Sequence, residues 1–164
     1  MKIKELVYII IYSLLFIIIS TISNTRYFSI LHYINLSILP LLISSYHLGI
    51  KKTLIVSIFS IMFLFIFGHM YTSSIIELIL KYILGYSIFS VACHYYNIKY
   101  FYTGILFTNT ISYILSFISD YIVYDGHIIE SIIYNTLVYV PTLIVSLILI
   151  PIVIKILIPI YYKK

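Results

Sequence analysis

Cysteine, tryptophan and charged residues are scarce in this sequence, and the scarcity excludes several classes of protein. The single cysteine, Cys93, rules out an internal disulfide, a cysteine-based zinc site and an iron–sulfur cluster. Charged residues make up 9% of the 164 residues, too few to cover the surface of a water-soluble globule. The sequence also lacks the HExxH, GxSxG and Walker motifs. We therefore expect no enzymatic activity, no metal and no cofactor.

Hydrophobic residues fill 63% of the chain instead. A helix needs roughly 20 apolar residues to cross a membrane, so the length suits about six spans with short connections. We predict an all-α membrane protein, with residues 1–164 forming a single integral membrane domain built as a six-transmembrane-helix bundle. The first span is expected to follow Lys4 and end near Ser20, and the others to lie at 29–48, 52–68, 73–95, 101–123 and 129–160.

Three features of these spans bear on their structure. The first apolar run has no small-x-small cleavage site at its end, so it is expected to be retained. Two other spans are expected to be irregular helices, because they contain residues that disturb a helix. These residues are Asn35, Ser37 and Pro40 in the second span, and Pro141, Pro151 and Pro159 in the last.

Basic residues predict the orientation. They gather before the first span and after every even-numbered span, at Lys2, Lys4, Lys51, Lys52, Lys99, Lys155, Lys163 and Lys164. The positive-inside rule makes that side cytoplasmic, so both termini are expected inside the cell. The acidic residues Asp120, Asp125 and Glu130 then lie outside. The net charge of +5 follows from this asymmetry and from anionic lipid, and indicates no nucleic-acid partner.

Glu77 and Lys81 are ionisable residues within the fourth span, where each needs a partner, a watery cavity or a ligand. They are four residues apart and so share a helix face. One interpretation is an ion pair that neutralises both. The other is that Glu77 anchors a ligand in an outward-facing pocket.

Polar residues also form stripes on the last two spans. The stripe on the fifth span consists of Asn109, Ser112, Ser116 and Asp120, and that on the sixth of Asn135, Tyr139 and Thr142, with Tyr134 beside it. Both spacings fit one helical face. Such stripes serve helix packing, or they line a site. The topology places Glu77 and Asn135 in the outer half and Asn109 near the middle, so we expect the three to converge on a site open to the outside.

Two segments carry a family resemblance. INLSILPLLISSYHLG (34–49) and SIIYNTLVYVPTLIVS (131–146) resemble the second-helix and last-helix motifs of the S-components of energy-coupling factor (ECF) vitamin transporters, in the thiamine-specific branch. The resemblance extends over most of the chain in length, span number and order. It implies a subunit of the cell membrane that captures thiamine at the outer face. It also implies two kinds of partner, a transmembrane coupling subunit and two cytoplasmic ATPases.

The resemblance implies roles for particular residues. Asn135 matches the family's ligand-binding asparagine, and Glu77 falls close to the carboxylate that receives the vitamin. Glu77 would then offset the thiazolium charge, while Asn135 and Asn109 hydrogen-bond the pyrimidine edge. Tyr134 and Tyr139 would stack on the rings, and Ser112 lies on the same stripe as Asn109.

Several positions depart from the family pattern. Asn109 stands where the family tends to have histidine, and Glu130 where it has a binding tyrosine. The binding tryptophans are absent, with His32 and Phe117 near those positions. The small residues by which the first helix docks its membrane partner have Ser13 and Ser20 as their nearest counterparts.

Two alternatives remain open at the level of the sequence. The first is an S-component for riboflavin or another small precursor, in which a buried carboxylate would matter little. The second is a membrane scaffold without a transport role, similar to a rod-shape-determining protein, in which the polar stripes would only pack helices.

Overall fold

The computed structural model describes residues 3–24, 34–67, 70, 72–95, 101–123 and 127–157, and all regular structure in these ranges is helical. The all-α prediction is therefore confirmed. The first three helices are α1 (Ile3–Asn24), α2 (Ile38–Leu48) and α3 (Ile50–Ile66). One continuous stretch then comprises α4 (Ile75–Glu77), η2 (Leu78–Leu84), α5 (Gly85–Ser87) and η3 (Ile88–Tyr95), and it is followed by α6 (Phe101–Val123) and α7 (Ile128–Leu157).

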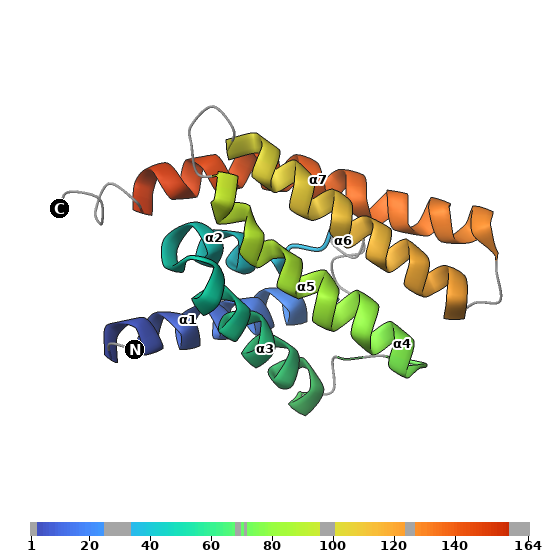
Figure 1. Cartoon of the computed structure of the whole chain (residues 1–164), viewed down its shortest axis with the longest axis horizontal. Coiled ribbons are helices and arrows are strands. Elements are labelled where there is room, and N and C mark those ends of the chain that lie inside the picture. Colours follow the sequence, from blue (N-terminus) through green and yellow to red (C-terminus); the bar gives the residue numbers. More distant parts are fainter. Residues whose placement is uncertain are drawn as a thin grey trace.

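The helical stretches run back and forth, so the start of α1 and the end of α7 lie at the same end of the molecule (Figure 1). Four stretches are long and apolar enough to cross a membrane: Ile3–Ser23, Ile75–Tyr95, Tyr102–Val123 and Ile128–Ile156. The 11 residues of α2 extend only about 16 Å, half of the roughly 30 Å hydrocarbon layer. Six spans with cytoplasmic termini therefore remain a prediction.

The outer faces of the long helices are as apolar as their inner faces. Helix α1 buries Ile9, Tyr12 and Phe16 at helical spacing against the rest of the molecule. Its opposite side exposes Leu6, Val7, Ile10, Ile11, Leu14, Leu15, Ile18 and Ile22. A helix that is apolar all round is stable only where lipid replaces water on its free side. The chain is thus built for a bilayer.

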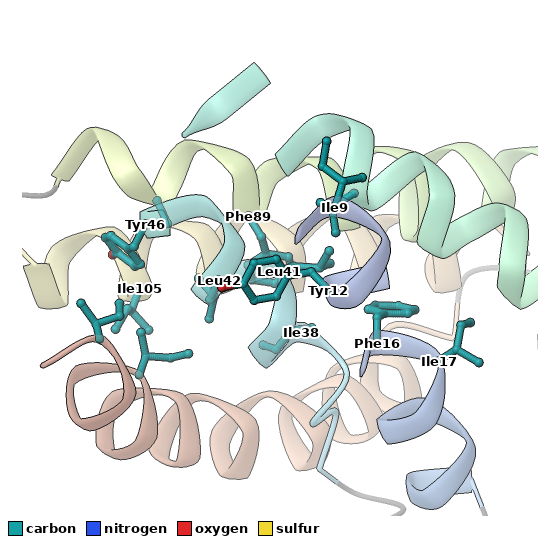
Figure 2. Packing of buried hydrophobic residues seen from close by; sticks show 14 of the residues in the cluster. Ile9, Tyr12, Phe16, Ile17, Ile38, Leu41, Leu42, Tyr46, Phe89 and Ile105 are labelled. Atoms are coloured by element: carbon teal, nitrogen blue, oxygen red, sulfur yellow. The ribbon is translucent and has the colours of Figure 1, made fainter. Parts of the chain in front are cut away.

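The short helix α2 lies at the centre of the hydrophobic core. Leu41 and Leu42 are fully buried there. Figure 2 shows the surrounding side chains, which include Phe16 of α1, Phe89 of η3 and Ile105 of α6. Helix α2 therefore contributes packing, although it is too short to cross the membrane alone.

The irregularity predicted for the second span, 29–48, is confirmed at its Asn35 and Ser37. The helix begins only at Ile38. Before it, the Ser37 hydroxyl donates to Asn35 Oδ1, and the Asn35 backbone N–H donates to Thr142 Oγ1 of α7 at 2.8 Å. Short polar side chains compete in this way with helical hydrogen bonds. Residues 29–33 lie outside the described residues.

The irregularity predicted for the last span stays a prediction between residues 128 and 157, where the prolines cause no break. Helix α7 continues through Pro141 and Pro151 without a break. Proline is tolerated in membrane helices because neighbouring groups and small backbone adjustments satisfy the freed carbonyls. Pro159 lies outside the described residues.

The helix between residues 75 and 95 is also irregular. Leu78–Leu84 is a π-helix and Ile88–Tyr95 a 3-10 helix. Ser45 of α2 fixes the latter, since its hydroxyl donates to the Ser90 carbonyl at 2.8 Å and accepts from the Cys93 N–H at 2.9 Å. A side chain from another helix thus supplies hydrogen bonds that a regular α-helix would supply itself.

Candidate binding site

Glu77 caps the start of α4. Ser74 is the N-cap residue, and its hydroxyl accepts the Glu77 N–H at 3.1 Å. In return, Glu77 Oε2 accepts the backbone N–H of Ser73 at 2.9 Å and the Ser73 hydroxyl at 3.0 Å. The Ser-x-x-Glu spacing is that of a capping box. One carboxylate oxygen is therefore committed to the helix start.

The other oxygen of Glu77 faces Lys81. Lys81 Nζ lies 3.6 Å from Glu77 Oε1 and 3.1 Å from Asp120 Oδ1 of α6. Asp120 Oδ2 accepts a hydrogen bond of 2.8 Å from Asn135 Nδ2 of α7, which also donates to the Ser131 carbonyl at 2.9 Å. We call Glu77, Lys81, Asp120 and Asn135 the polar network. It ties the π-helical stretch to α6 and α7.

The polar network contains two carboxylates and one ammonium group. Glu77 and Asp120 are 4% and 3% exposed, whereas the Lys81 side chain keeps 29% of its surface accessible. A buried charge without a counter-charge is costly in a low dielectric. Among the described residues, the network thus has a formal excess of one negative charge, which makes this region a favourable place for a small cation.

A cavity of about 500 Å³ opens next to the polar network. Its lining comes from η2, the end of α6 and the start of α7, and consists of Lys81, Asp120, Val123, His127, Glu130, Ser131 and Tyr134. Its volume falls within the range of roughly 300–1,000 Å³ that is typical of small-molecule sites. We call it the large cavity. It lies toward the end of the bundle where α6 connects to α7 (Figure 1).

A second cavity, of about 60 Å³, lies between α6, α7, Asn35, the start of α2 and η3. Its lining includes Asn35, Ile38, Phe89, Asn109, Ser112, Tyr113, Ser116, Asn135, Val138, Tyr139 and Thr142. At roughly 30 Å³ per water molecule it has room for about two waters. We call it the small cavity. It is polar, but it is too small for a vitamin.

The structure brings some of the predicted site residues together and separates others. Asn109 and Asn135 line the same small cavity, together with Ser112 and Tyr139. Asn135 also reaches the large cavity through its hydrogen bond to Asp120. Tyr134 lines the large cavity, and Glu77 lines neither cavity.

The remaining predicted residues have these positions. His32 lies outside the described residues. The Tyr139 hydroxyl pairs with Thr110 Oγ1 at 2.9 Å, and its ring centroid lies 4.9 Å from that of Tyr113. Ser13 is buried inside the chain, with its hydroxyl 3.4 Å from the Val56 carbonyl of α3. It therefore faces α3 and not a partner protein.

Sequence reasoning missed the central position of Asp120, which it assigned to a stripe but not to the binding site. It also missed Ser73 and His127. The available signal was that ionisable residues inside a membrane occur in partnered groups, so an acidic residue late in the fifth span was a candidate partner for Lys81. The Ser-x-x-Glu spacing before the fourth span was a second signal.

No family model matches this chain, and no curated protein matches it either. Within the described ranges, no group of three or more histidine, cysteine, aspartate or glutamate side chains is arranged to hold a metal ion. The polar network and the large cavity are thus the features on which a function is argued.

Proposed function

We propose that this protein is the substrate-capture subunit of an ECF-type transporter and that it binds thiamine at the outer face of the cell membrane. The observation that carries the proposal is the large cavity beside a buried excess of carboxylate. Thiamine is a small flat molecule with a permanent positive charge on its thiazolium ring. Its binding would supply the counter-charge that the polar network lacks.

The lining of the large cavity suits the two ends of such a ligand. Asp120 offers a buried carboxylate to the cationic ring, whereas the Glu130 carboxylate is exposed and screened by water. Tyr134 offers a ring face, which attracts a cation by roughly 0.5–2 kcal/mol. Ser131 lines the cavity and can hydrogen-bond the polar edge of the ligand, and Asn135 donates to the Ser131 carbonyl. Glu77 serves as the partner of Lys81 and does not touch the ligand in this arrangement.

A contact between the two segments that resemble ECF S-components also supports the proposal. Asn35 in the first segment donates its backbone N–H to Thr142 in the second at 2.8 Å. Residues 107 positions apart therefore meet beside the small cavity. The same resemblance is the basis for the proposed partners, a transmembrane coupling subunit and two ATPases that power release inside the cell.

Binding measurements with purified protein test the proposal. The chain has 19 tyrosines and no tryptophan, so ligand binding is followed by quenching of tyrosine fluorescence and by calorimetry. We expect saturable binding of thiamine and none of riboflavin, because a neutral ring system brings no counter-charge. Binding of riboflavin in place of thiamine would overturn the choice of ligand.

One observation favours a second candidate, a membrane scaffold without a transport role. Each member of the polar network already has a partner within the protein, as expected for groups that only pack helices. A scaffold would bind neither vitamin in the same measurement, and removing the charge of Asp120 would change stability alone.

A further inference from the structure

Lys81 occupies the place that a cationic ligand needs. Its ammonium group forms part of the wall of the large cavity and lies 3.1 Å from Asp120, the buried carboxylate of that cavity. A cation that enters the cavity must therefore compete with Lys81 for Asp120. A neutral molecule that displaced the ammonium group would leave the charge of Asp120 unbalanced.

Glu77 is placed to receive the ammonium that is displaced. The two hydrogen bonds from Ser73 fix its Oε2 atom, so the carboxylate does not move with the lysine. Its Oε1 atom faces Lys81 Nζ at 3.6 Å, which is longer than a charge-assisted hydrogen bond of roughly 2.7–2.9 Å. A shift of about 1 Å at the end of the flexible lysine side chain would close that gap.

We propose that Lys81 is a resident counter-ion that a cationic ligand displaces from Asp120, and that Glu77 accepts the displaced ammonium group. This inference rests on the proposed function and adds its selectivity: Lys81 competes with every ligand that approaches Asp120, and only a cation replaces the charge of the ammonium group. Asp120 stays in place during the exchange because Asn135 holds its second oxygen at 2.8 Å.

The polar groups that line the large cavity cannot replace Glu77 as the acceptor of the displaced ammonium group. Glu130 and Tyr134 lie on the exposed side of α7, and His127 lies just before that helix. Charges exposed in this way are screened by water and contribute little. Glu77 alone combines a fixed carboxylate with a position one turn before Lys81 on the same stretch.

Two substitutions, alone and combined, test the exchange by thiamine calorimetry. Lys81→Met removes the competitor, so thiamine is expected to bind about tenfold more tightly. Glu77→Gln removes the acceptor of the displaced ammonium but keeps an oxygen for Ser73, so thiamine is expected to bind about tenfold more weakly. In the Lys81→Met background, Glu77→Gln is expected to change the affinity less than about twofold. Lys155→Met, an exposed lysine at the other end of α7, serves as control and should change nothing.

The outcomes separate the inference from the proposed function. If neither the wild type nor Lys81→Met binds thiamine, the proposed function is wrong. If thiamine binds but Glu77→Gln has no effect, or weakens binding equally with and without Lys81, the exchange is wrong while the function stands. Thermal melts followed by circular dichroism identify any variant that does not fold. Should Lys81→Met be one of these, the affinity of Glu77→Gln alone decides.

Discussion

Substituting asparagine for Asp120 removes one charge from the polar network and leaves the shape of the side chain unchanged. Asn135 keeps an oxygen to which it can donate, so its 2.8 Å hydrogen bond survives. Lys81, in contrast, loses the nearer of its two carboxylate partners, at 3.1 Å, and keeps only Glu77 at 3.6 Å. The variant Asp120→Asn thus removes the charge together with the acceptor of Lys81, because its amide nitrogen takes the place of Oδ1.

The expected cost follows from the burial of the pair. Breaking a fully buried ion pair costs about 3–5 kcal/mol. The Lys81 side chain is 29% exposed and retains Glu77, so water and the second carboxylate recover part of this cost. We expect Asp120→Asn to lower the free energy of unfolding by about 1–2 kcal/mol. Loss of the carboxylate facing the ligand should also weaken thiamine binding by about 2 kcal/mol, or roughly 30-fold.

Thermal unfolding in detergent and thiamine calorimetry measure the two effects on the same sample. Glu130→Gln is the matched control, because Glu130 lines the same cavity but is exposed on α7. The Glu130→Gln substitution should lower the free energy of unfolding and the free energy of thiamine binding by less than about 1 kcal/mol each. An Asp120→Asn variant that binds thiamine within twofold of the wild type would refute the reasoning from charge.

Three further expectations test the fold. Gly104→Ala places a Cβ 2.8 Å from a backbone oxygen of η3 and should destabilise by about 1–3 kcal/mol. Gly85→Ala, at 3.3 Å from the Leu80 backbone oxygen, should cost less than Gly104→Ala, and melting temperatures compare the two. Ser45→Ala removes the hydroxyl that bridges two backbone groups of η3 and should cost about 1–3 kcal/mol, with faster amide exchange at Cys93. In a cysteine-free background, a membrane-impermeant maleimide should label Lys51→Cys only from the cytoplasm and Glu130→Cys only from outside; the reverse would overturn the orientation.

The ends of the long helices could be predicted closely from the sequence. The spans expected at 101–123 and 129–160 correspond to α6 at Phe101–Val123 and α7 at Ile128–Leu157. These helices are long apolar runs between polar breaks, and their ends follow from local composition. Helix α7 shows the limit of such reasoning, since Pro141 and Pro151 lie inside a helix that continues past both of them.

The irregular stretch between residues 75 and 95 could not be predicted from its own residues. Its 3-10 part depends on Ser45, which is 45 positions away from Ser90 and arrives on another helix. The irregular start of the second span followed from Asn35 and Ser37, but the contact of Asn35 with Thr142 of α7 did not. Propensity and periodicity describe neighbours along the chain, so they carry no information on such hydrogen bonds.

In the candidate site, too, some features followed from local sequence and others depend on contacts between distant residues. Helical spacing led to Asn109 and Asn135, which line one cavity, because each lies on a polar stripe that must turn away from lipid. Spacing also pointed to Glu77 as the partner of Lys81, since the two are one turn apart. The closer partner, Asp120, is 39 positions away, and only the packing of α6 against η2 brings it within 3.1 Å.

The capping box decides which carboxylate is free to meet a cation. Glu77 Oε2 accepts two hydrogen bonds from Ser73, and turning it toward a ligand would leave a backbone N–H at the start of α4 without a partner. That loss would offset much of the gain from a new ionic contact. Asp120 is bonded to side chains instead, and one of them, Lys81, can move to Glu77 while Asn135 keeps its hydrogen bond to the second oxygen. A cation in the large cavity is therefore balanced by Asp120, and Glu77 acts on it only through Lys81.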